Sequence, residues 1–359
     1  MEYATSMRNG NCSGQSMESC VSPYPRPATL FASAAAILFI AIGVTGNLIT
    51  ALALLRCSKL RGHATTAFVI SLSFSDLLFC ATNLPLTASR YINEAWVLGD
   101  TLCKLFPFFF YGNVAVSLMN MVAITINRYI LIACRSYYDR LYTRKYIALM
   151  LAFAWLFSFS MMVPPLAGYW GQFGLHAPTF SCTILKKNGL SPKKFLFVFG
   201  FFLPCVVIIT SYTCIYWKVR QSRLNLQSYS TNGAVTCSQQ NNQRREDIRL
   251  TRMMTIIFSC FLLCFLPLML VNVVDDEVKY PTVHVLASVL AWASSVVNPF
   301  IYAGSNRQYR AAYRELFLGP PKIIQIHKSS ATQSGSGRTT VTEMRQCSAV
   351  KSHQNAPFQ

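Results

Sequence analysis

The chain has 359 residues, of which 53% are hydrophobic and only 13% are charged. Soluble domains carry about 25% charged residues, so the composition excludes an ordinary soluble protein and indicates a membrane protein. The formal net charge of +19 is spread unevenly: 22 of the 32 Lys and Arg residues fall on one predicted side of the membrane and nine on the other. This bias follows the positive-inside rule, and no basic-aromatic motif competes with it, so we expect no nucleic-acid partner.

Residues 1–27 are predicted to form an extracellular tail, because they are polar and contain several prolines. No basic region precedes an apolar core, so no cleavable signal peptide is evident. Asn11 starts an Asn-Cys-Ser glycosylation sequon, which requires an extracellular location. Two interpretations of the tail stay open: either Cys12 and Cys20 pair, or the tail is disordered and has no cross-link.

Seven apolar segments follow, and each is long enough to cross a bilayer as a helix. We predict them at 28–55, 65–91, 101–134, 146–166 and 192–220, from after the basic stretch 244–252 to about 274, and at 281–304. Residues 221–243 are predicted to be a flexible cytoplasmic loop, 305–318 a basic amphipathic helix on the inner membrane surface, and 319–359 a disordered cytoplasmic tail. Seven crossings and the charge bias both place the amino terminus outside and the carboxyl terminus inside.

The second segment carries Asp76, about 17 Å from its start at 1.5 Å per residue and so close to the bilayer midplane. A carboxylate at that depth is costly unless paired, and it usually marks a functional site. Asn113 and Ser117 of the third segment lie near that depth, while Ser294 and Asn298 share one face of the seventh. One charge and several oxygens suit a sodium ion, which we favour over a hydrogen-bonded network through water. No other cofactor or metal is expected.

The third segment joins Cys103 at the outer interface to Arg128 at the inner interface, because 25 residues of helix span about 38 Å. Arg128, followed by Tyr129, is predicted to be a switch that faces the cytoplasm. Asp247, which precedes the sixth segment, could pair with Arg128. The alternative for Asp247 is a solvated carboxylate among neighbouring arginines.

The outer half of the bundle is predicted to hold a ligand pocket. Its candidate residues are Phe106, Phe110, Tyr111 and Val114 on the third segment, Met269 and Asn272 on the sixth, and His284, Ser288 and Trp292 on the seventh. An apolar pocket with few polar groups suits a lipid or other apolar ligand, and the alternative for each residue is packing between helices. Arg90 could hold an anionic headgroup, but the favoured interpretation is an interfacial arginine whose charged end reaches water.

One short motif occurs in each segment, in order along the chain. The motifs are Gly46-Asn47, Leu72 with Asp76, Asn127-Arg128-Tyr129, Trp155, Pro204 with Tyr212, Cys264-Phe265-Leu266-Pro267, and Asn298-Pro299-Phe300-Ile301-Tyr302. Together they resemble the rhodopsin-like (class A) family of G-protein-coupled receptors across residues 28–317. The stretch 124–129 and the Trp-Gly pair in the second outer loop resemble the insect branch of that family that contains the Moody and Trapped-in-endoderm receptors.

The resemblance implies an all-α membrane protein, a seven-transmembrane helix bundle with a short amphipathic eighth helix, in the cell membrane and without enzymatic activity. It implies activation of a heterotrimeric G protein and binding of arrestin through the Ser/Thr-rich tail. It also implies a disulfide between Cys103 and Cys182. In the implied switch, Phe265 rocks over Pro267, and Tyr212 and Tyr302 stabilise the switch arginine once the sixth helix swings out.

Two positions depart from the family pattern, and a third differs from the amine receptors. The family has Asp or Glu before the switch arginine, whereas this chain has Asn127, which cannot form that charge pair. The sixth-segment motif has Phe265 in place of Trp and therefore lacks an indole N–H donor. Both changes predict a less tightly held resting state. Phe110 stands where amine receptors carry Asp, which leaves a charged amine without a partner.

An apolar or lipid-like ligand is therefore favoured over a peptide or a melatonin-like small molecule. The alternative from a different class is a seven-helix transporter or channel, which needs charged residues along a path across the membrane. Asp76 and Arg128 interrupt the apolar spans at different depths, so no such path is visible. A retinal-binding opsin needs a Lys in the seventh segment, and 281–304 contains none.

Overall fold

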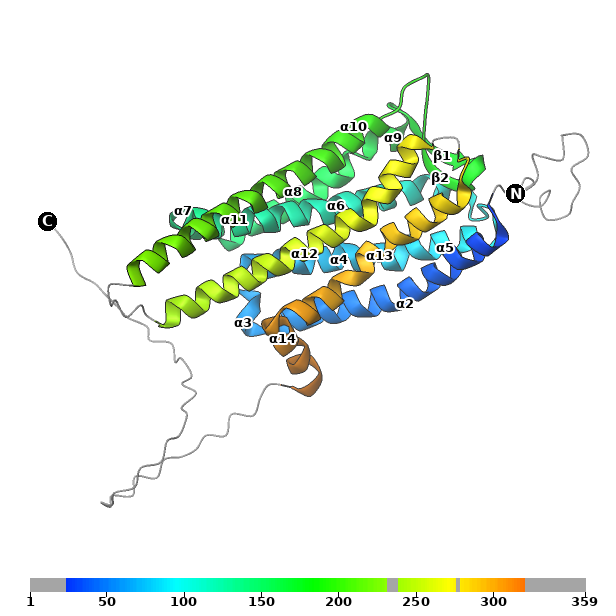
Figure 1. Cartoon of the computed structure of the whole chain (residues 1–359). Helices are drawn as coiled ribbons and strands as arrows, with labels where there is room; N and C mark the ends of the chain where they lie inside the picture. The colour runs from blue at the N-terminus through cyan, green and yellow to red at the C-terminus, as the bar shows by residue number, and fades with distance from the viewer. Residues whose placement is uncertain (1–23, 231–237, 276–277, 320–359) are drawn as a thin grey trace, which may run out of the picture. The chain divides into compact units, whose positions relative to one another are not determined.

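The chain folds as a bundle of long helices with one short β-hairpin (Figure 1). The computed structural model describes residues 24–230, 238–275 and 278–319. Within those ranges, seven helical segments are long and apolar enough to cross a membrane, which confirms the predicted all-α seven-helix bundle. The predictions for Asn11, Cys12, Cys20 and residues 320–359 lie outside the described part of the chain.

The spanning segments are continuous helices or helices joined end to end. In chain order they are α2 (Arg26–Arg56); α4, η2 and α5 (Ala64–Leu78, Phe79–Asn83, Leu84–Ile92); α6 (Gly99–Ala133); α8 and α9 (Arg144–Ser160, Val163–Ala167); α10, η4 and α11 (Lys193–Phe197, Val198–Phe202, Leu203–Ser230); α12 (Ser238–Val274); and α13 (Pro281–Ser305). Three short helices connect or follow them: α3 (Ser58–Arg61), α7 (Arg135–Leu141) and α14 (Arg307–Leu318).

Five of the predicted spans match these helices to within a few residues, but the fifth and sixth helices extend further, so the predicted flexible loop at 221–243 is wrong in part. Helix α11 continues to Ser230, and α12 already begins at Ser238. Gln, Arg and Leu are good helix formers, and extending an existing helix is far easier than starting a new one. Composition alone therefore underestimated how far both helices extend.

Two spanning segments contain a π-helical turn just before a proline. The turn η2 includes Ala81, four residues before Pro85, and η4 includes Gly200, four residues before Pro204. Proline has no N–H group, and its ring clashes with the carbonyl four residues earlier in a regular α-helix. The wider π turn accommodates the ring while the helix continues across the membrane.

Helix α6 is the central element of the bundle. It packs against α4, α8, α11 and α12, and both strands of the hairpin lie against it. Gly112 allows the close approach of α8, because a Cβ atom there would lie 2.5 Å from the Phe159 ring. Small residues at such contacts are typical of membrane helices, whose association depends on close packing.

One end of the bundle carries the β-hairpin, and we call it the hairpin end (Figure 1). Strand β1 (Gln172–His176) pairs antiparallel with β2 (Ser181–Leu185), and the 3-10 turn η3 (Ala177–Thr179) connects them. Phe180 closes the turn in a left-handed conformation, with φ +36°. Its buried ring packs against Tyr24 and Tyr91, so the turn covers the ends of α2 and α5.

The opposite end carries α14, and we call it the α14 end (Figure 1). The Asn306 side chain caps this helix by accepting the Gln308 N–H at 2.8 Å. The buried Tyr309 ring stacks on Tyr302 of α13 at 5.5 Å between ring centroids, and the Tyr313 hydroxyl lies 3.0 Å from Thr50 Oγ1 of α2. One face of the predicted amphipathic helix is thus fixed to the bundle.

Candidate functional site

A small polar cavity lies inside the bundle, around Asp76. All five predicted sodium-site residues line it: Asp76, Asn113, Ser117, Ser294 and Asn298. The rest of its wall consists of Phe79, Val114, Met121, Phe261, Phe265 and Ser295. Four spanning segments contribute to this cavity, which has room for about one water-sized group.

The Asp76 carboxylate is buried and accepts two side-chain hydrogen bonds. Asn298 Nδ2 donates to Oδ2 at 2.7 Å, and Ser117 Oγ donates to Oδ1 at 3.2 Å. Ser75 extends the network, because its Oγ lies 3.1 Å from Ser117 Oγ and donates to the Asn113 carbonyl. The structure therefore unites α4, α6 and α13 around one negative charge.

Two further oxygens in the cavity are suited to a cation. The buried Oδ1 of Asn113 has no hydrogen-bond partner among the described residues. Ser294 Oγ donates to the Ala291 carbonyl and keeps its lone pairs. Together with the Asp76 carboxylate, these are neutral and anionic oxygen ligands of the kind that hard cations prefer. The residues present fit the predicted sodium ion.

Helix α12 closes this cavity with aromatic rings. Phe265 is 3% exposed, and its ring centroid lies 4.6 Å from that of Phe261. Pro267, two residues further on, is half-buried within the same helix. A movement of α12 would displace Phe265 from the cavity wall, which links the predicted sodium site to the predicted switch.

Arg128 lies buried at the α14 end of α6 and contacts two other helices. Its Nη1 lies 3.4 Å from Asp247 Oδ1 on α12, and its Nη2 donates to Thr65 Oγ1 on α4. Thr65 in turn donates to Asn127 Oδ1 at 2.8 Å, and Asn127 Nδ2 donates to the Tyr138 hydroxyl of α7 at 3.3 Å. The pair with Asp247, which the sequence left open, is formed in the structure.

The other predicted switch residues lie near this network without bonding to it. Tyr302 is fully buried against α14, and Pro299 packs against Gly46 of α2. Tyr212 is half-buried and lines a second, apolar cavity together with Leu72, Met121, Ile124, Thr125, Met254, Ile257 and Phe258. Tyr129 is half-buried and shares none of the side-chain hydrogen bonds described for Arg128.

The predicted ligand residues of α6 divide between two surfaces. Phe110 and Val114 pack against a cluster that includes residues of η2, α5 and α13, and the Phe110 ring lies 5.7 Å from Phe106 and 5.3 Å from Phe79. Tyr111 lies on a different side of α6, and its role in ligand binding stays a prediction. Its hydroxyl lies 2.9 Å from Thr183 Oγ1 of β2, because consecutive helix residues point about 100° apart.

The candidates on α12 and α13 are also split. Trp292 is buried and joins the surface of Phe110 and Val114, with its ring 5.9 Å from Tyr91. Met269 and Ser288 are half-buried, but Asn272 is exposed, so the structure does not place it on the pocket wall. We call the surface made by Phe106, Phe110, Val114, Trp292, Tyr91 and Phe79 the aromatic wall.

His284 is engaged at the start of α13. Its Nε2 lies 3.1 Å from Asp275 Oδ2, and the Asp275 carboxylate also accepts the backbone N–H groups of Lys279 and Tyr280. Desolvation raises the pKa of Asp275, but these donors outweigh it and hold the pKa below its usual value. His284 therefore joins the start of α13 to Asp275, which directly follows α12.

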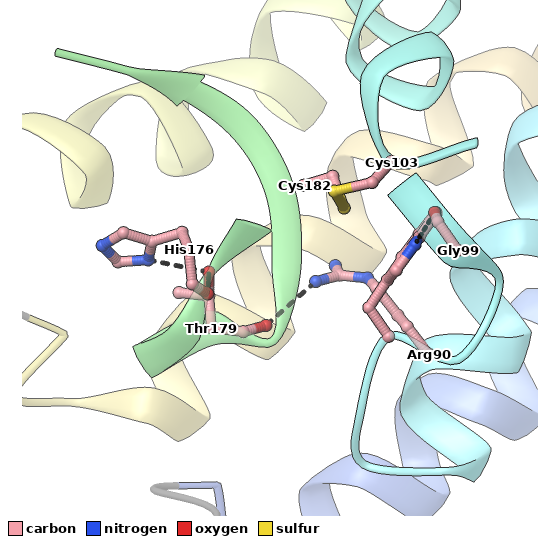
Figure 2. Close-up of a disulfide and its surroundings, with 7 residues drawn as sticks. Arg90, Gly99, Cys103, His176, Thr179 and Cys182 are labelled. Atoms are coloured by element: carbon pink, nitrogen blue, oxygen red, sulfur yellow. Dashed lines mark hydrogen bonds between the residues drawn. A yellow bond between two sulfur atoms is a disulfide. The ribbon is translucent and has the colours of Figure 1, made fainter. Parts of the chain in front are cut away.

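Arg90, on the last turn of α5, contradicts the favoured sequence interpretation, because its side chain is 8% exposed and does not reach water. Its Nη1 donates to the Thr179 carbonyl at 3.2 Å, and its Nη2 donates to the Tyr91 hydroxyl at 3.2 Å. Figure 2 shows the guanidinium extending from the helix toward the hairpin turn, near the Cys103–Cys182 disulfide. The hairpin covers Arg90, and the local sequence contains no signal for that cover.

The disulfide implied by the family resemblance is present. Cys103 of α6 and Cys182 of β2 are bonded, with their Cα atoms 5.2 Å apart (Figure 2). Phe106 and Trp96 pack around the bond.

Thr65 and Tyr138, which complete the hydrogen-bond network of Arg128, were not predicted from the sequence, since single hydroxyls near helix ends have no distinctive spacing.

Comparisons with known proteins agree with this architecture. The family model described as 7 transmembrane receptor (rhodopsin family) matches residues 46–302. Protein trapped in endoderm-1 of Drosophila melanogaster is 54% identical, over 88% of this chain and 87% of its own length. The G-protein coupled receptor moody of D. melanogaster is 35% identical, over 82% of this chain and 52% of its own length.

More distant matches extend the same pattern. Melatonin receptor type 1B-B of Danio rerio is 30% identical, over 86% of this chain and 88% of its own length. Squid rhodopsin superposes with a TM-score of 0.73 at 24% identity, covering 82% of this chain and 87% of that structure. The last match supports the fold alone.

Proposed function

Because the chain belongs to the rhodopsin family of seven-transmembrane receptors, we propose that it binds an apolar or lipid-like ligand at the hairpin end and activates a heterotrimeric G protein at the α14 end. Membership makes it a multi-pass membrane receptor, and the predicted link to the Moody and Trapped-in-endoderm branch is confirmed. The proposal places the hairpin end outside the cell, where oxidising conditions favour disulfides.

The aromatic wall is the observation that carries the ligand proposal. Phe110 occupies the position where amine receptors carry Asp, and its ring lies against Phe79 and Phe106. A protonated amine would meet no carboxylate on this wall, whereas an apolar chain would bury surface against it at about 25 cal/mol per Å². A lipid or similar apolar molecule therefore fits best.

A melatonin-like small molecule is the second candidate, and the relative from Danio rerio favours it. A flat aromatic ligand would also suit the rings of the aromatic wall. A peptide ligand has less support, because the turn residue Phe180 and Tyr24 are both buried over the hairpin end.

A ligand screen would test the proposal. Cells expressing the chain are exposed to lipids, indoleamines, monoamines and peptides, and G-protein dissociation is recorded. We expect apolar lipids to activate the receptor, and Phe110→Ala to lower their potency about tenfold or more. In the control Phe108→Ala, which removes a ring that faces Phe159 of α8, the potency of the lipids should be unchanged. Potent activation by a small monoamine, unchanged in Phe110→Ala, would exclude the apolar ligand.

We propose that sodium binds the Asp76 cavity and favours the resting state. The cavity wall includes Phe265 of α12, so an outward movement of that helix would disturb the site. A ligand that prefers one state shifts the population toward it. Replacing potassium with sodium should lower ligand-free nucleotide exchange in wild type and in the exposed control Asp100→Asn, but not in Asp76→Asn. An equal sodium effect in all three would rule out this site.

The signalling partners act at the α14 end in this proposal. Arg128 would leave Asp247 when α12 moves and would then be available to the G protein. Arrestin would bind through the Ser/Thr-rich tail, whose residues lie beyond the described part of the chain.

A further inference from the structure

Arg90 is a buried cation without an anionic partner among the described residues. It forms no ion pair with Asp or Glu there, and its compensation consists of one carbonyl, one hydroxyl and the face of the Tyr91 ring, 4.4 Å from Cζ. Burying a charge costs free energy unless an opposite charge or hydrogen bonds replace water. The site therefore favours an anion from outside the chain.

Two carboxylates at the same end of the bundle are already engaged. Glu94 Oε1 accepts the Thr29 hydroxyl at 2.8 Å. Asp275 accepts two backbone N–H groups and contacts His284. Neither one neutralises Arg90.

Several N–H groups of the Arg90 guanidinium are available to donate hydrogen bonds to a ligand. Of its five N–H groups, the two hydrogen bonds described above use one on Nη1 and one on Nη2, and Nε has no partner within the described residues. The edge formed by Nε and Nη2 is one that carboxylates and phosphates bind with two parallel hydrogen bonds. The bond from Nη1 to Thr179 meanwhile fixes the orientation of the group.

The surroundings of Arg90 suit an amphipathic molecule. Tyr91 packs against Phe180 at 5.7 Å and against Trp292 at 5.9 Å, and Leu86, one turn earlier on α5, packs against the cluster of Cys103, Phe106 and Cys182. The charge thus sits at the hairpin end of the aromatic wall. A headgroup beside Arg90 would leave an attached chain in contact with that wall.

We propose that Arg90 recognises the anionic headgroup, a carboxylate or a phosphate, of an amphipathic lipid ligand. This inference rests on the proposed function and narrows its apolar ligand to an anionic lipid. The headgroup binds the Nε–Nη2 edge, and the apolar chain lies along the aromatic wall. Arg90 thereby discriminates a charged lipid from its neutral counterpart.

The test uses full-length receptor in nanodiscs of phosphatidylcholine, with nucleotide exchange as the readout. Two probe pairs share one chain each: oleic acid with methyl oleate, and oleoyl lysophosphatidic acid with monooleoylglycerol. The variant Arg90→Gln loses the charge but keeps a donor for the Thr179 carbonyl. Arg90→Lys keeps the charge and loses the planar pair of N–H donors. The control is Lys104→Gln, at an exposed lysine of the same end.

In wild type we expect one anionic probe to act at a concentration at least tenfold lower than its neutral partner, and the pair that responds identifies carboxylate or phosphate. Arg90→Gln should remove this tenfold preference, about 1.4 kcal/mol, while Arg90→Lys keeps part of it and Lys104→Gln keeps all of it. If Arg90→Gln lowered the potency of both members of a pair equally, Arg90 would only support the hairpin. If Arg90→Gln kept the preference for the anionic probe, Arg90 would not recognise the headgroup.

The failures of this inference and of the proposed function are distinct. A neutral lipid as potent as its anionic partner in wild type would leave the apolar ligand in place and overturn only the role of Arg90. Silence of all four probes, in a receptor with measurable ligand-free exchange, would overturn the lipid ligand itself.

Discussion

The two ends of the bundle each bury an arginine, but they compensate its charge differently. Arg128 at the α14 end is 3% exposed and pairs with Asp247. Arg90 at the hairpin end is 8% exposed and has only neutral partners within the described chain. The α14 end therefore supplies its own anion, whereas no carboxylate among the described residues pairs with Arg90 at the hairpin end.

The ends also differ in how firmly their elements are joined. At the hairpin end, a disulfide and packed rings hold α6, the hairpin and α5 together. At the α14 end, α12 is held by the Arg128–Asp247 contact and by a bond from Gln308 Nε2 to Glu246 Oε2 at 2.9 Å. The comparison suggests a fixed end that receives the ligand and a reversible end that produces the signal.

The largest effect is expected from Arg128→Ala. It removes the buried cation that contacts α4 and α12 and that would meet the G protein, so nucleotide exchange should fall almost to background with or without ligand. Exchange with purified G protein at matched surface expression is the measurement. The exposed arginine of α7 offers the control Arg135→Ala, and normal signalling by Arg128→Ala would show that the α14 end works without its buried charge.

Loss of the disulfide should be the next largest effect and should act at the hairpin end. Removing a native disulfide typically costs about 2–5 kcal/mol. Cys103→Ser with Cys182→Ser should lower the thermal stability of the receptor and abolish ligand response, while ligand-free exchange persists in the folded fraction. Cys214→Ser, at an exposed free cysteine, is the control. A stable double variant with full ligand response would contradict a fixed hairpin end.

The smallest effect is expected at Gln308. A net hydrogen bond contributes about 0.5–1.5 kcal/mol, and this exposed one should lie at the low end of that range. Gln308→Ala should raise ligand-free exchange about twofold to threefold, and Gln308→Glu should raise it further, because two carboxylates would then face each other. A lower rate in Gln308→Glu would mean that this bond does not restrain α12.

Much of the fold followed from the sequence because apolar length and charge bias are direct consequences of the bilayer. The Asp76 site could also be predicted from the sequence, since the depth of a residue in a straight helix is fixed by residue count. The five residues predicted from three separate segments all line its cavity, although the six other residues of its wall were not predicted for it. These features depend on position along a helix and on little else.

The sequence did not predict features that depend on how separate elements pack against one another. Arg90 was expected at the water interface, but the hairpin, whose turn residue Thr179 is 89 positions away in sequence, covers it. The contact of Tyr111 with Thr183 of the hairpin was not predicted, because the rotation of α6 relative to its neighbours is not encoded in spacing alone. Thr65 was overlooked because a single hydroxyl gives no pattern until Arg128 and Asn127 meet it.

The expected ligand-free signalling depends most on Asn127. The family carries a carboxylate there, whereas here Asn127 binds Thr65 and Tyr138, and Asp247 supplies the only anion seen to contact Arg128 within the described residues. A hydrogen bond to a charged group contributes about 1.5–3 kcal/mol, and about 1.4 kcal/mol already changes a two-state ratio tenfold. We therefore expect measurable signalling without ligand, restrained chiefly by Asp247.

Ligand-free nucleotide exchange at matched surface expression tests this claim most directly, in Asn127→Asp, Asp247→Asn and the exposed control Asp139→Asn. We expect a lower rate for Asn127→Asp, because a second carboxylate beside Arg128 strengthens the resting state. We expect about a tenfold higher rate for Asp247→Asn and no change for the control. An unchanged or raised rate in Asn127→Asp would show that the missing carboxylate does not set the resting equilibrium.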